Sequence, residues 1–278
     1  MHWLLLSILI DFGFVQLFKY GQRKRLYAPI VVSTNYLTVA LSLGIYLATT
    51  DQFTISEPAL KTGLMTGVVF ISSMTLMTYV MEIAPVGTVL TAFRMSIAVP
   101  VALGVSLWGE VITPEQLGGI PLALLALVLM TSSFKRTTQI SKGKALGFLF
   151  AVFFIQGISH SCLRSVHYTG LDDQFLQVLL ITGATAGTIG SIGIALQKRR
   201  PTRSELALGS FIGLYNALAL CIIMITLSKL PGTLFFPAMG CGVVLLDNLA
   251  AHFFWKERLN RLAGLGVALA VAAIVLVI

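Results

Sequence analysis

Apolar residues run almost without interruption along most of this chain, in stretches separated by short clusters of charged residues, glycine and proline. A helix that spans the hydrocarbon core of a bilayer needs about 20 mostly apolar residues. Ten segments fit that length approximately, namely residues 2–18, 29–49, 62–81, 86–108, 116–133, 145–166, 174–196, 205–228, 232–254 and 261–278. The pattern predicts an all-α membrane protein with ten transmembrane helices, whose connecting loops are too short to fold as a further domain.

The composition agrees with this prediction. Of 278 residues, 56% are hydrophobic and 11% are charged, whereas soluble domains carry about a quarter charged residues. The cysteines Cys162, Cys221 and Cys241 lie inside apolar stretches without metal-ligand or CxxC spacing, so we expect no metal and no cofactor. Because no basic residues precede the first apolar stretch, we also expect that stretch to be a retained helix rather than a cleavable signal peptide.

Lysine and arginine are concentrated in alternate loops. The odd-numbered loops hold 15 of these 19 residues and the even-numbered loops hold three, with Arg94 inside a predicted helix. Positive side chains near helix ends are retained in the cytoplasm. We therefore expect a plasma (inner) membrane protein with both termini extracytoplasmic, and we attribute the net charge of +8 to cytoplasmic loops rather than to nucleic-acid binding.

The second half of the chain repeats features of the first half at an offset of 146 or 147 residues. Gly63, Gly67, Pro85, Trp108, Glu110 and Gly119 recur as Gly209, Gly213, Pro231, Trp255, Glu257 and Gly266. Five helices per half would give the two copies opposite orientations, as in the inverted repeats of many secondary transporters. We expect five-helix repeats at residues 1–133 and 145–278, joined by a basic cytoplasmic linker at 134–144.

Two segments carry a likeness to a known family. They are Ala84–Val86 with Trp108–Glu110 and Gly118–Gly119, and Leu230–Gly232 with Phe236–Pro237, Trp255–Leu259 and Gly264–Gly266. Together with the ten helices and the repeat, they make the chain resemble the ten-helix, EamA-type members of the drug/metabolite transporter superfamily. This resemblance implies a transporter. Many members are described with both termini inside the cell, whereas the cations here predict the opposite.

Ionisable side chains deep inside predicted helices are the main candidates for a site, because a charge near the bilayer centre costs at least about 2.5–3.5 kcal/mol. Arg94 and Asp247 lie at a similar depth, about 5–6 Å to the cytoplasmic side of the midplane, so Asp247 is the expected partner of Arg94. We predict six substrate-binding residues, Arg94, Asp247, Asn35, Asn216, Asp11 and His160. Of these, Asp11, Asp247 and His160 are candidates for a proton relay, and Arg164 is a further charged residue at one helix end.

Other conspicuous residues have structural interpretations. The steps Gly63/Gly67, Gly209/Gly213, Gly183/Gly187 and Gly143/Gly147 are typical of closely packed membrane helices. Pro100 and Pro237 interrupt two predicted helices, and they indicate either broken helices beside a binding site or simple packing kinks. Glu110 and Glu257 are expected to lie at the start of the following helix, where the helix dipole favours a carboxylate.

We predict a secondary carrier that moves a small metabolite or drug-like solute by alternating access, driven by an ion gradient or by exchange. Helices 1–4 and 6–9 would enclose the cavity. The alternatives are an intramembrane enzyme and a lipid-handling or scaffold protein. The chain has no HExxH or GxSxG motif, and His160 and Cys162 are two residues apart and point to different sides of a helix. We therefore predict no catalytic residues.

Overall fold

The structure of the chain is a computed structural model that describes residues 1–83, 86–131, 142–253 and 261–277. The described residues form α-helices and one short 3-10 helix, with no β-strand among them. The predicted all-α fold is therefore confirmed.

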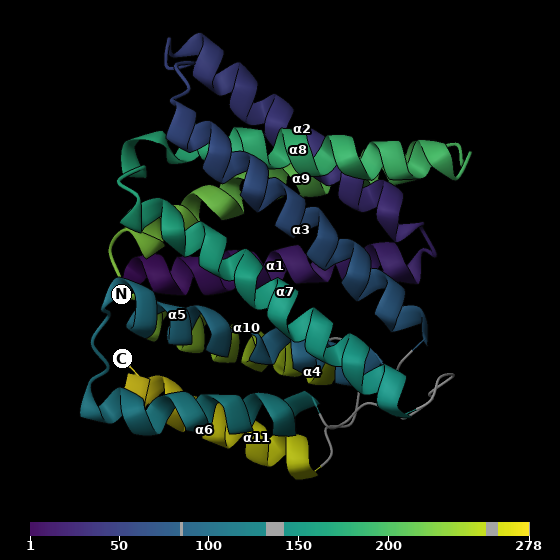
Figure 1. The fold of residues 1–278 in the computed structure, drawn as a ribbon. Coiled ribbons are helices and arrows are strands. Elements are labelled where there is room, and N and C mark those ends of the chain that lie inside the picture. The colour runs from purple at the N-terminus through teal and green to yellow at the C-terminus, as the bar shows by residue number, and fades with distance from the viewer. Residues whose placement is uncertain (84–85, 132–141, 254–260, 278) are drawn as a thin grey trace. The chain divides into compact units, whose positions relative to one another are not determined.

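The helices follow the predicted spans closely (Figure 1). They are α1 (His2–Arg23), α2 (Ala28–Thr49), α3 (Glu57–Ile83), α4 (Val86–Met95), α5 (Ala98–Trp108), α6 (Pro114–Thr131), α7 (Lys142–Tyr168), the 3-10 helix η1 (Asp172–Gln174), α8 (Phe175–Leu196), α9 (Arg203–Leu227), α10 (Gly232–Phe253) and α11 (Arg261–Val277). Seven helices in the described part of the chain, α1, α2, α3, α7, α8, α9 and α10, are long and apolar enough to cross a membrane. The segments Ala92–Trp108, Pro114–Leu129 and Gly264–Val277 are apolar but shorter.

The predicted span 86–108 divides into α4 and α5 at Ser96 and Ile97, so of the two interpretations of Pro100 the structure has the broken helix. Pro100 has no N–H to donate to the Ser96 carbonyl, four residues earlier, and its ring clashes with that carbonyl in a regular helix. The Ser96 carbonyl instead accepts a 3.0 Å hydrogen bond from the Val99 N–H. As a result, helix α4 ends at Met95, the residue that follows Arg94.

Of the two interpretations of Pro237, the broken helix is not found, since α10 continues through this residue. Its missing N–H leaves the carbonyl of Thr233, four residues earlier, without its usual intrahelical donor. The first N–H groups of a helix have no intrahelical acceptor, and those of Gly232 and Thr233 are held instead by the carboxylate of Glu110. These contacts secure the start of α10 on the N-terminal side of the proline.

The described chain divides into two compact units. Unit 1 comprises residues 1–12, 79–161 and 229–278, and unit 2 comprises residues 13–78 and 162–228. Each unit therefore contains segments from both halves of the sequence, and the division points in the two halves lie about 150 residues apart. The repeat boundaries at 133 and 145 remain predictions, and the predicted linker 134–144 lies largely outside the described residues.

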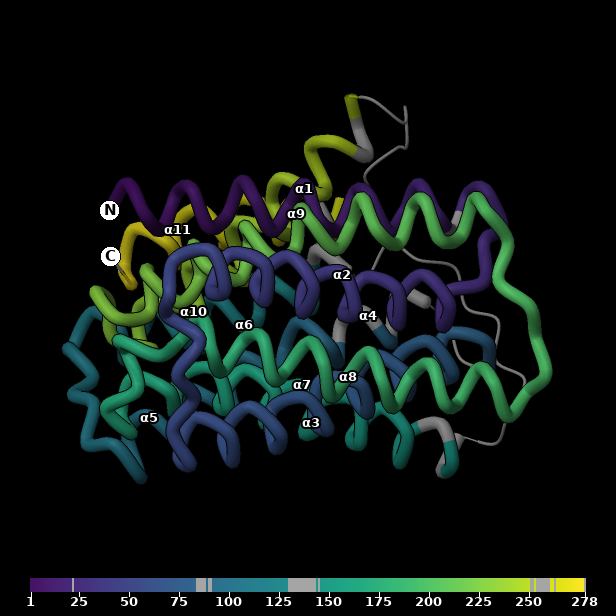
Figure 2. The backbone as a smooth tube through the Cα atoms, turned by 90° about the horizontal axis from the view of Figure 1, so that it is seen from above, coloured from purple at the N-terminus to yellow at the C-terminus, as the bar shows by residue number. Residues whose placement is uncertain are grey.

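In unit 2, α2 packs along α8 and α9 (Figure 2). Glycines make these approaches close. A Cβ atom added at Gly183 of α8 would lie 2.9 Å from the backbone oxygen of Tyr36, and one added at Gly187 would lie 2.8 Å from the backbone nitrogen of Leu37. The packing predicted for this pair of glycines is confirmed.

The two repeat-matched glycine steps make equivalent contacts. An added Cβ at Gly67 of α3 would lie 2.6 Å from the Cβ of Thr185 in α8, and one at Gly213 of α9 would lie 2.5 Å from the Cβ of Thr38 in α2. The close packing predicted for these steps is confirmed, with α3 against α8 and α9 against α2. At Gly147, by contrast, an added Cβ would meet nothing within 4 Å among the described residues, so the packing predicted for the Gly143/Gly147 step stays a prediction.

Hydrogen bonds between helix ends fix the helix directions within unit 2. The Tyr27 N–H at the start of α2 donates to Oε1 of Glu205 at the start of α9, over 3.0 Å. At the other end of α2, the Ser56 N–H before α3 donates to Oε1 of Gln174 before α8, over 3.2 Å. Helices α2 and α9 therefore run in one direction, and α3 and α8 run in the opposite direction.

Similar contacts fix the helix directions within unit 1. Glu110, which follows α5, accepts hydrogen bonds from the N–H groups of Gly232 (3.0 Å) and Thr233 (2.8 Å) at the start of α10. Gln116 in the first turn of α6 donates through Nε2 to the carbonyl of Val277 at the end of α11, over 3.3 Å. Helix α5 thus runs against α10, and α6 runs against α11, beside which it lies (Figure 1).

These contacts correct the interpretation of Glu110. Its carboxylate stabilises the positive N-terminal end of a helix, as expected, but that helix is α10 from the other half of the chain rather than α6, which follows it. Its repeat counterpart Glu257 lies outside the described residues.

Candidate substrate-binding site

Three of the predicted site residues meet in unit 1 around the side chain of Arg94. Its Nη1 lies 3.7 Å from Oδ2 of Asp11, and its Nη2 lies 3.7 Å from Oδ2 of Asp247. The predicted pairing of Arg94 with Asp247 is confirmed, and Asp11 is a second carboxylate on the same guanidinium. We call Asp11, Arg94 and Asp247 the Arg94 cluster.

The Arg94 cluster joins three helices, since Asp11 belongs to α1, Arg94 to α4 and Asp247 to α10. The three side chains are only 14–22% exposed. A guanidinium remains charged in any protein environment, so it needs compensating groups at this depth of burial. Both carboxylates contact it through a single oxygen at a distance longer than an ordinary hydrogen bond, which makes the cluster an open rather than a bidentate ion pair.

Two glycines let α7 and α10 pack closely against the helix break that follows Arg94. An added Cβ at Gly157 of α7 would lie 2.4 Å from the Cβ of Val99 and 2.9 Å from the carbonyl oxygen of Ser96. One at Gly240 of α10 would lie 3.0 Å from Cδ1 of Ile97. The break that ends α4 after Arg94 is therefore firmly packed between α7 and α10.

His160 of α7 also belongs to unit 1 and lies close enough to Arg94 for the two groups to interact electrostatically. Its Nε2 lies 3.0 Å from Nε2 of Gln156, one turn earlier, and its ring centroid lies 5.7 Å from that of Phe236.

The two asparagines predicted for the site are hydrogen-bonded to each other in unit 2. Nδ2 of Asn216 in α9 donates to Oδ1 of Asn35 in α2 over 3.1 Å, and both residues are buried. An amide pair of this kind satisfies two polar groups between packed helices. The structure thus gives Asn35 and Asn216 a packing contact and assigns them to a different unit from the Arg94 cluster.

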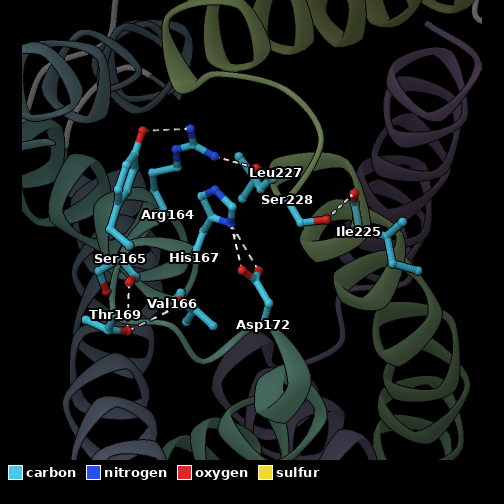
Figure 3. A network of polar contacts seen from close by, with 10 residues as sticks. Arg164, Ser165, Val166, His167, Thr169, Asp172, Ile225, Leu227 and Ser228 are labelled. Atoms are coloured by element: carbon cyan, nitrogen blue, oxygen red, sulfur yellow. Dashed lines mark hydrogen bonds and ion pairs between the residues drawn. The ribbon is translucent and has the colours of Figure 1, made fainter. Parts of the chain in front are cut away.

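Arg164, the remaining charged residue noted in the sequence, has a structural environment in unit 2 (Figure 3). Its Nη1 donates to the carbonyl of Leu227, the last residue of α9, and its Nη2 donates to the Tyr168 hydroxyl over 3.1 Å. A cation is favourable at the negative C-terminal end of a helix. Arg164 therefore stabilises the end of α9.

A hydrogen-bonded pair beside Arg164 was not predicted from the sequence. Nδ1 of His167, at the end of α7, lies 2.9 Å from Oδ2 of Asp172 in η1, and both residues are partly exposed (Figure 3). These two residues are five positions apart, a spacing that does not place them on one face of a helix. They meet because the chain reverses between them at Gly170, whose φ is +68°.

Comparisons with known proteins support the fold. No protein-family model matches the chain. A protein of Haemophilus influenzae described as an uncharacterized protein is 25% identical to it over 288 residues, which cover 99% of this chain and 96% of that protein. A solved structure described as "Crystal structure of protein" has a TM-score of 0.80 at 12% identity. The match covers 99% of this chain and 94% of the chain in that structure. At that identity, the likeness shows the fold alone.

Proposed function

We propose that this protein is a secondary carrier that moves a small metabolite or drug-like solute across the plasma (inner) membrane by alternating access, driven by an ion gradient or by exchange. Ten membrane-spanning segments would form two inverted five-helix repeats, with both termini extracytoplasmic. The apolar segment Ala92–Trp108, with α6 and α11, would supply the three spans beyond the seven long helices. The resemblance to EamA-type drug/metabolite transporters is part of this proposal.

The helix directions support an inverted repeat. The repeat pairs α2 with α8, α5 with α10 and α6 with α11, and the members of each pair run in opposite directions, as the hydrogen bonds between helix ends indicate. The equivalent contacts of Gly67 with Thr185 and of Gly213 with Thr38 agree with the same symmetry. Inverted repeats of this kind are typical of secondary transporters.

The Arg94 cluster is the observation that carries the proposal. Three ionisable groups contact one another inside apolar helices, beside a helix break, where charges are expensive and usually serve transport or ligand binding. A scaffold protein gains nothing from such a cluster. An intramembrane enzyme would need a nucleophile and a base or a metal centre, and the sequence offers no motif for either.

Flux measurements in proteoliposomes test the proposal. Purified protein is reconstituted with a pH-sensitive dye inside the vesicles, and solutes of different charge classes are added with and without a proton gradient. A carrier produces solute flux that responds to the gradient or to a solute on the opposite side. Vesicles without protein and vesicles with the Arg94→Lys variant are the controls. If no solute produces more flux than in the protein-free vesicles, the proposal is wrong.

A further inference from the structure

We propose that one end of unit 2 is a binding surface for anionic phospholipids, whose headgroup phosphates lie against arginine and lysine side chains. The surface consists of seven exposed cations from two loops, namely Arg23, Lys24, Arg25, Lys198, Arg199, Arg200 and Arg203. We call these seven residues the basic end of unit 2. The partner is a lipid rather than a solute, so this inference does not depend on what the protein carries.

Hydrogen bonds bring the two loops together. The Tyr27 hydroxyl donates to Oε1 of Gln197 over 2.8 Å, across 170 residues of sequence. The Tyr27 N–H donates to Oε1 of Glu205 over 3.0 Å. Arg25 precedes Tyr27 by two residues, and Lys198 directly follows Gln197. Cations from two distant parts of the chain therefore lie at the same end of the unit.

One buried carboxylate accompanies these cations. Among residues 19–28 and 196–206 of the sequence, Glu205 is the one acidic residue, and its side chain is 3% exposed. Its oxygens accept hydrogen bonds from the N–H groups of Tyr27 and Thr202, and Arg199 lies 3.6 Å away. A single carboxylate cannot balance seven cations, so the basic end attracts anions.

The basic end lies at the level expected for lipid headgroups. The apolar spans of α1 and α8 end at Gly21 and Leu196, and those of α2 and α9 begin at Ala28 and Arg203, so the cations lie at the ends of these spans. Leu196 is 79% exposed, and Ile192, one turn earlier on the same face of α8, is 56% exposed. A phospholipid matches both features, with its phosphate at the cations and an acyl chain along α8.

Two of the cations occupy backbone positions that favour glycine. Arg25 and Lys198 each have a φ of 53°, in the left-handed region that residues with a side chain seldom adopt. The turn before α8 uses Gly170, with a φ of 68°, in the same region. At the other end of unit 2, Asp51 has a φ of 54° and precedes Lys198 by the repeat offset of 147 residues. These turns therefore require the backbone conformation but not a cation.

Retention of positive charge in the cytoplasm does not explain these positions. That effect depends on the number of lysines and arginines near helix ends, so other positions in the same loops would serve it equally well. Arg203 lies in the first turn of α9, where the helix dipole disfavours a cation. Cations kept where they cost stability indicate that their side chains bind a ligand.

Lipid titrations of the purified full-length protein test the proposal. Dioleoyl phosphatidylglycerol and dioleoyl phosphatidylcholine have the same acyl chains and both contain a phosphate, but only the first carries a net charge. Each is added in mixed micelles, and inorganic phosphate is added separately, while thermal stability is measured. We expect phosphatidylglycerol to stabilise the protein with an apparent affinity about tenfold or more above that of phosphatidylcholine. Inorganic phosphate should have no effect at the same concentrations.

Variants locate the lipid. Arg25→Gly combined with Lys198→Gly removes two charges, and glycine suits the positive φ at both positions. Each cation near an anionic lipid surface changes affinity about fivefold, so this variant should bind phosphatidylglycerol about tenfold or more weakly and still fold. Asp51→Gly is the matched control, because it removes an exposed charge at a similar φ, and it should bind like the unaltered protein. Arg200→Gln combined with Arg203→Gln should weaken binding similarly without altering a residue at positive φ.

Several outcomes would overturn the proposal. They are equal stabilisation by the two lipids, full phosphatidylglycerol binding in both double variants, and an equal loss of binding in Asp51→Gly. Stabilisation by inorganic phosphate would indicate a site for free anions and would also overturn the lipid assignment. Because no step measures flux, these results are independent of the proposed carrier activity.

Discussion

The backbone N–H of Tyr27, at the start of α2, donates a 3.0 Å hydrogen bond to Oε1 of Glu205, in the first turn of α9. Oε2 of the same buried carboxylate accepts a 2.8 Å hydrogen bond from the Thr202 N–H and completes a capping box. The guanidinium of Arg199 lies 3.6 Å from Oε1 and covers the ring of Tyr27. One carboxylate thus holds the starts of two helices at the same end of unit 2.

We predict that Glu205→Ala destabilises the protein by about 2 kcal/mol or more, because it leaves the N–H groups of Tyr27 and Thr202 without their acceptor. Thermal unfolding in detergent measures the effect. Glu57→Ala is the matched control, since Glu57 is an exposed glutamate in the first turn of α3 and should change stability by less than about 0.5 kcal/mol. Equal stability of the two variants would contradict the role of Glu205.

The contact between Tyr27 and Glu205 also bears on the topology. It gathers exposed cations from two odd-numbered loops at one end of unit 2, namely Arg23, Lys24, Arg25, Lys198, Arg199, Arg200 and Arg203. At the end where Ser56 meets Gln174, Lys61 is paired with Glu57, and Asp51 and Asp173 are exposed. This separation of charge is the one that the loop count predicted from sequence.

We therefore predict that the basic end of unit 2 faces the cytoplasm and that both termini are extracytoplasmic. Alkaline phosphatase fused after Ile278 should be active, and a fluorescent protein fused at the same position should be dark. A fluorescent protein fused after Arg200, in the loop between α8 and α9, should be bright. Bright fluorescence after Ile278 would reverse the orientation, although it would leave the helix directions within each unit unchanged.

We predict that Gly67→Leu and Gly213→Leu reduce expression and thermal stability more than they change solute selectivity. At both glycines an added Cβ would already lie within 2.6 Å of a threonine Cβ on the neighbouring helix, so a large side chain forces the backbones apart. Gly147→Leu is the control, because an added Cβ there meets nothing within 4 Å. If all three variants were equally stable, these close approaches would not matter to the fold.

We predict that Glu110→Ala lowers stability by about 1–3 kcal/mol, because the buried N–H groups of Gly232 and Thr233 lose their acceptor. Glu110→Gln should lose less, since the amide keeps one acceptor oxygen. Glu115→Gln changes an exposed glutamate in the first turn of α6 and serves as the control for both. If Glu115→Gln proved more harmful than Glu110→Ala, Glu110 would not be the residue that stabilises a helix start.

Much of the helical fold could be predicted from sequence, because apolar length is a local property that decides where a long membrane helix forms. The break at Ser96 and Ile97 was harder to predict, since prolines occur in both α5 and α10 and only Pro100 interrupts its helix. The start of α10 is held by Glu110, which comes from a remote part of the chain. Apolar pattern alone contains no information about such a contact.

The site was predictable in part. The predicted depth of the two residues in the membrane was enough to choose Asp247 as the partner of Arg94, and the structure shows this ion pair. Depth did not identify Asp11 as the second partner, because it does not specify which helices are neighbours. Depth also gave no sign that Asn35 and Asn216, both predicted as site residues, hydrogen-bond to each other between α2 and α9.

We predict different stability effects for two changes in the Arg94 cluster. Asp247→Asn keeps the shape of the side chain and leaves Arg94 the carboxyl group of Asp11, so it should cost less than about 1 kcal/mol of stability while transport is lost. Arg94→Ala leaves two carboxylates without their cation and should destabilise by about 3–5 kcal/mol. Thermal unfolding of the two purified variants measures both effects. A loss of stability in Asp247→Asn as large as in Arg94→Ala would indicate a purely structural ion cluster.

The central claim is that the Arg94 cluster binds the transported solute, and the most direct test is solute flux through Arg94→Lys in proteoliposomes, measured together with folded yield. Lysine keeps the positive charge but loses the planar fork that faces Asp11 and Asp247 at once. We predict a folded yield near that of the unaltered protein, and flux reduced by about tenfold or more. Full flux in Arg94→Lys, and above all in Arg94→Ala, would contradict the account.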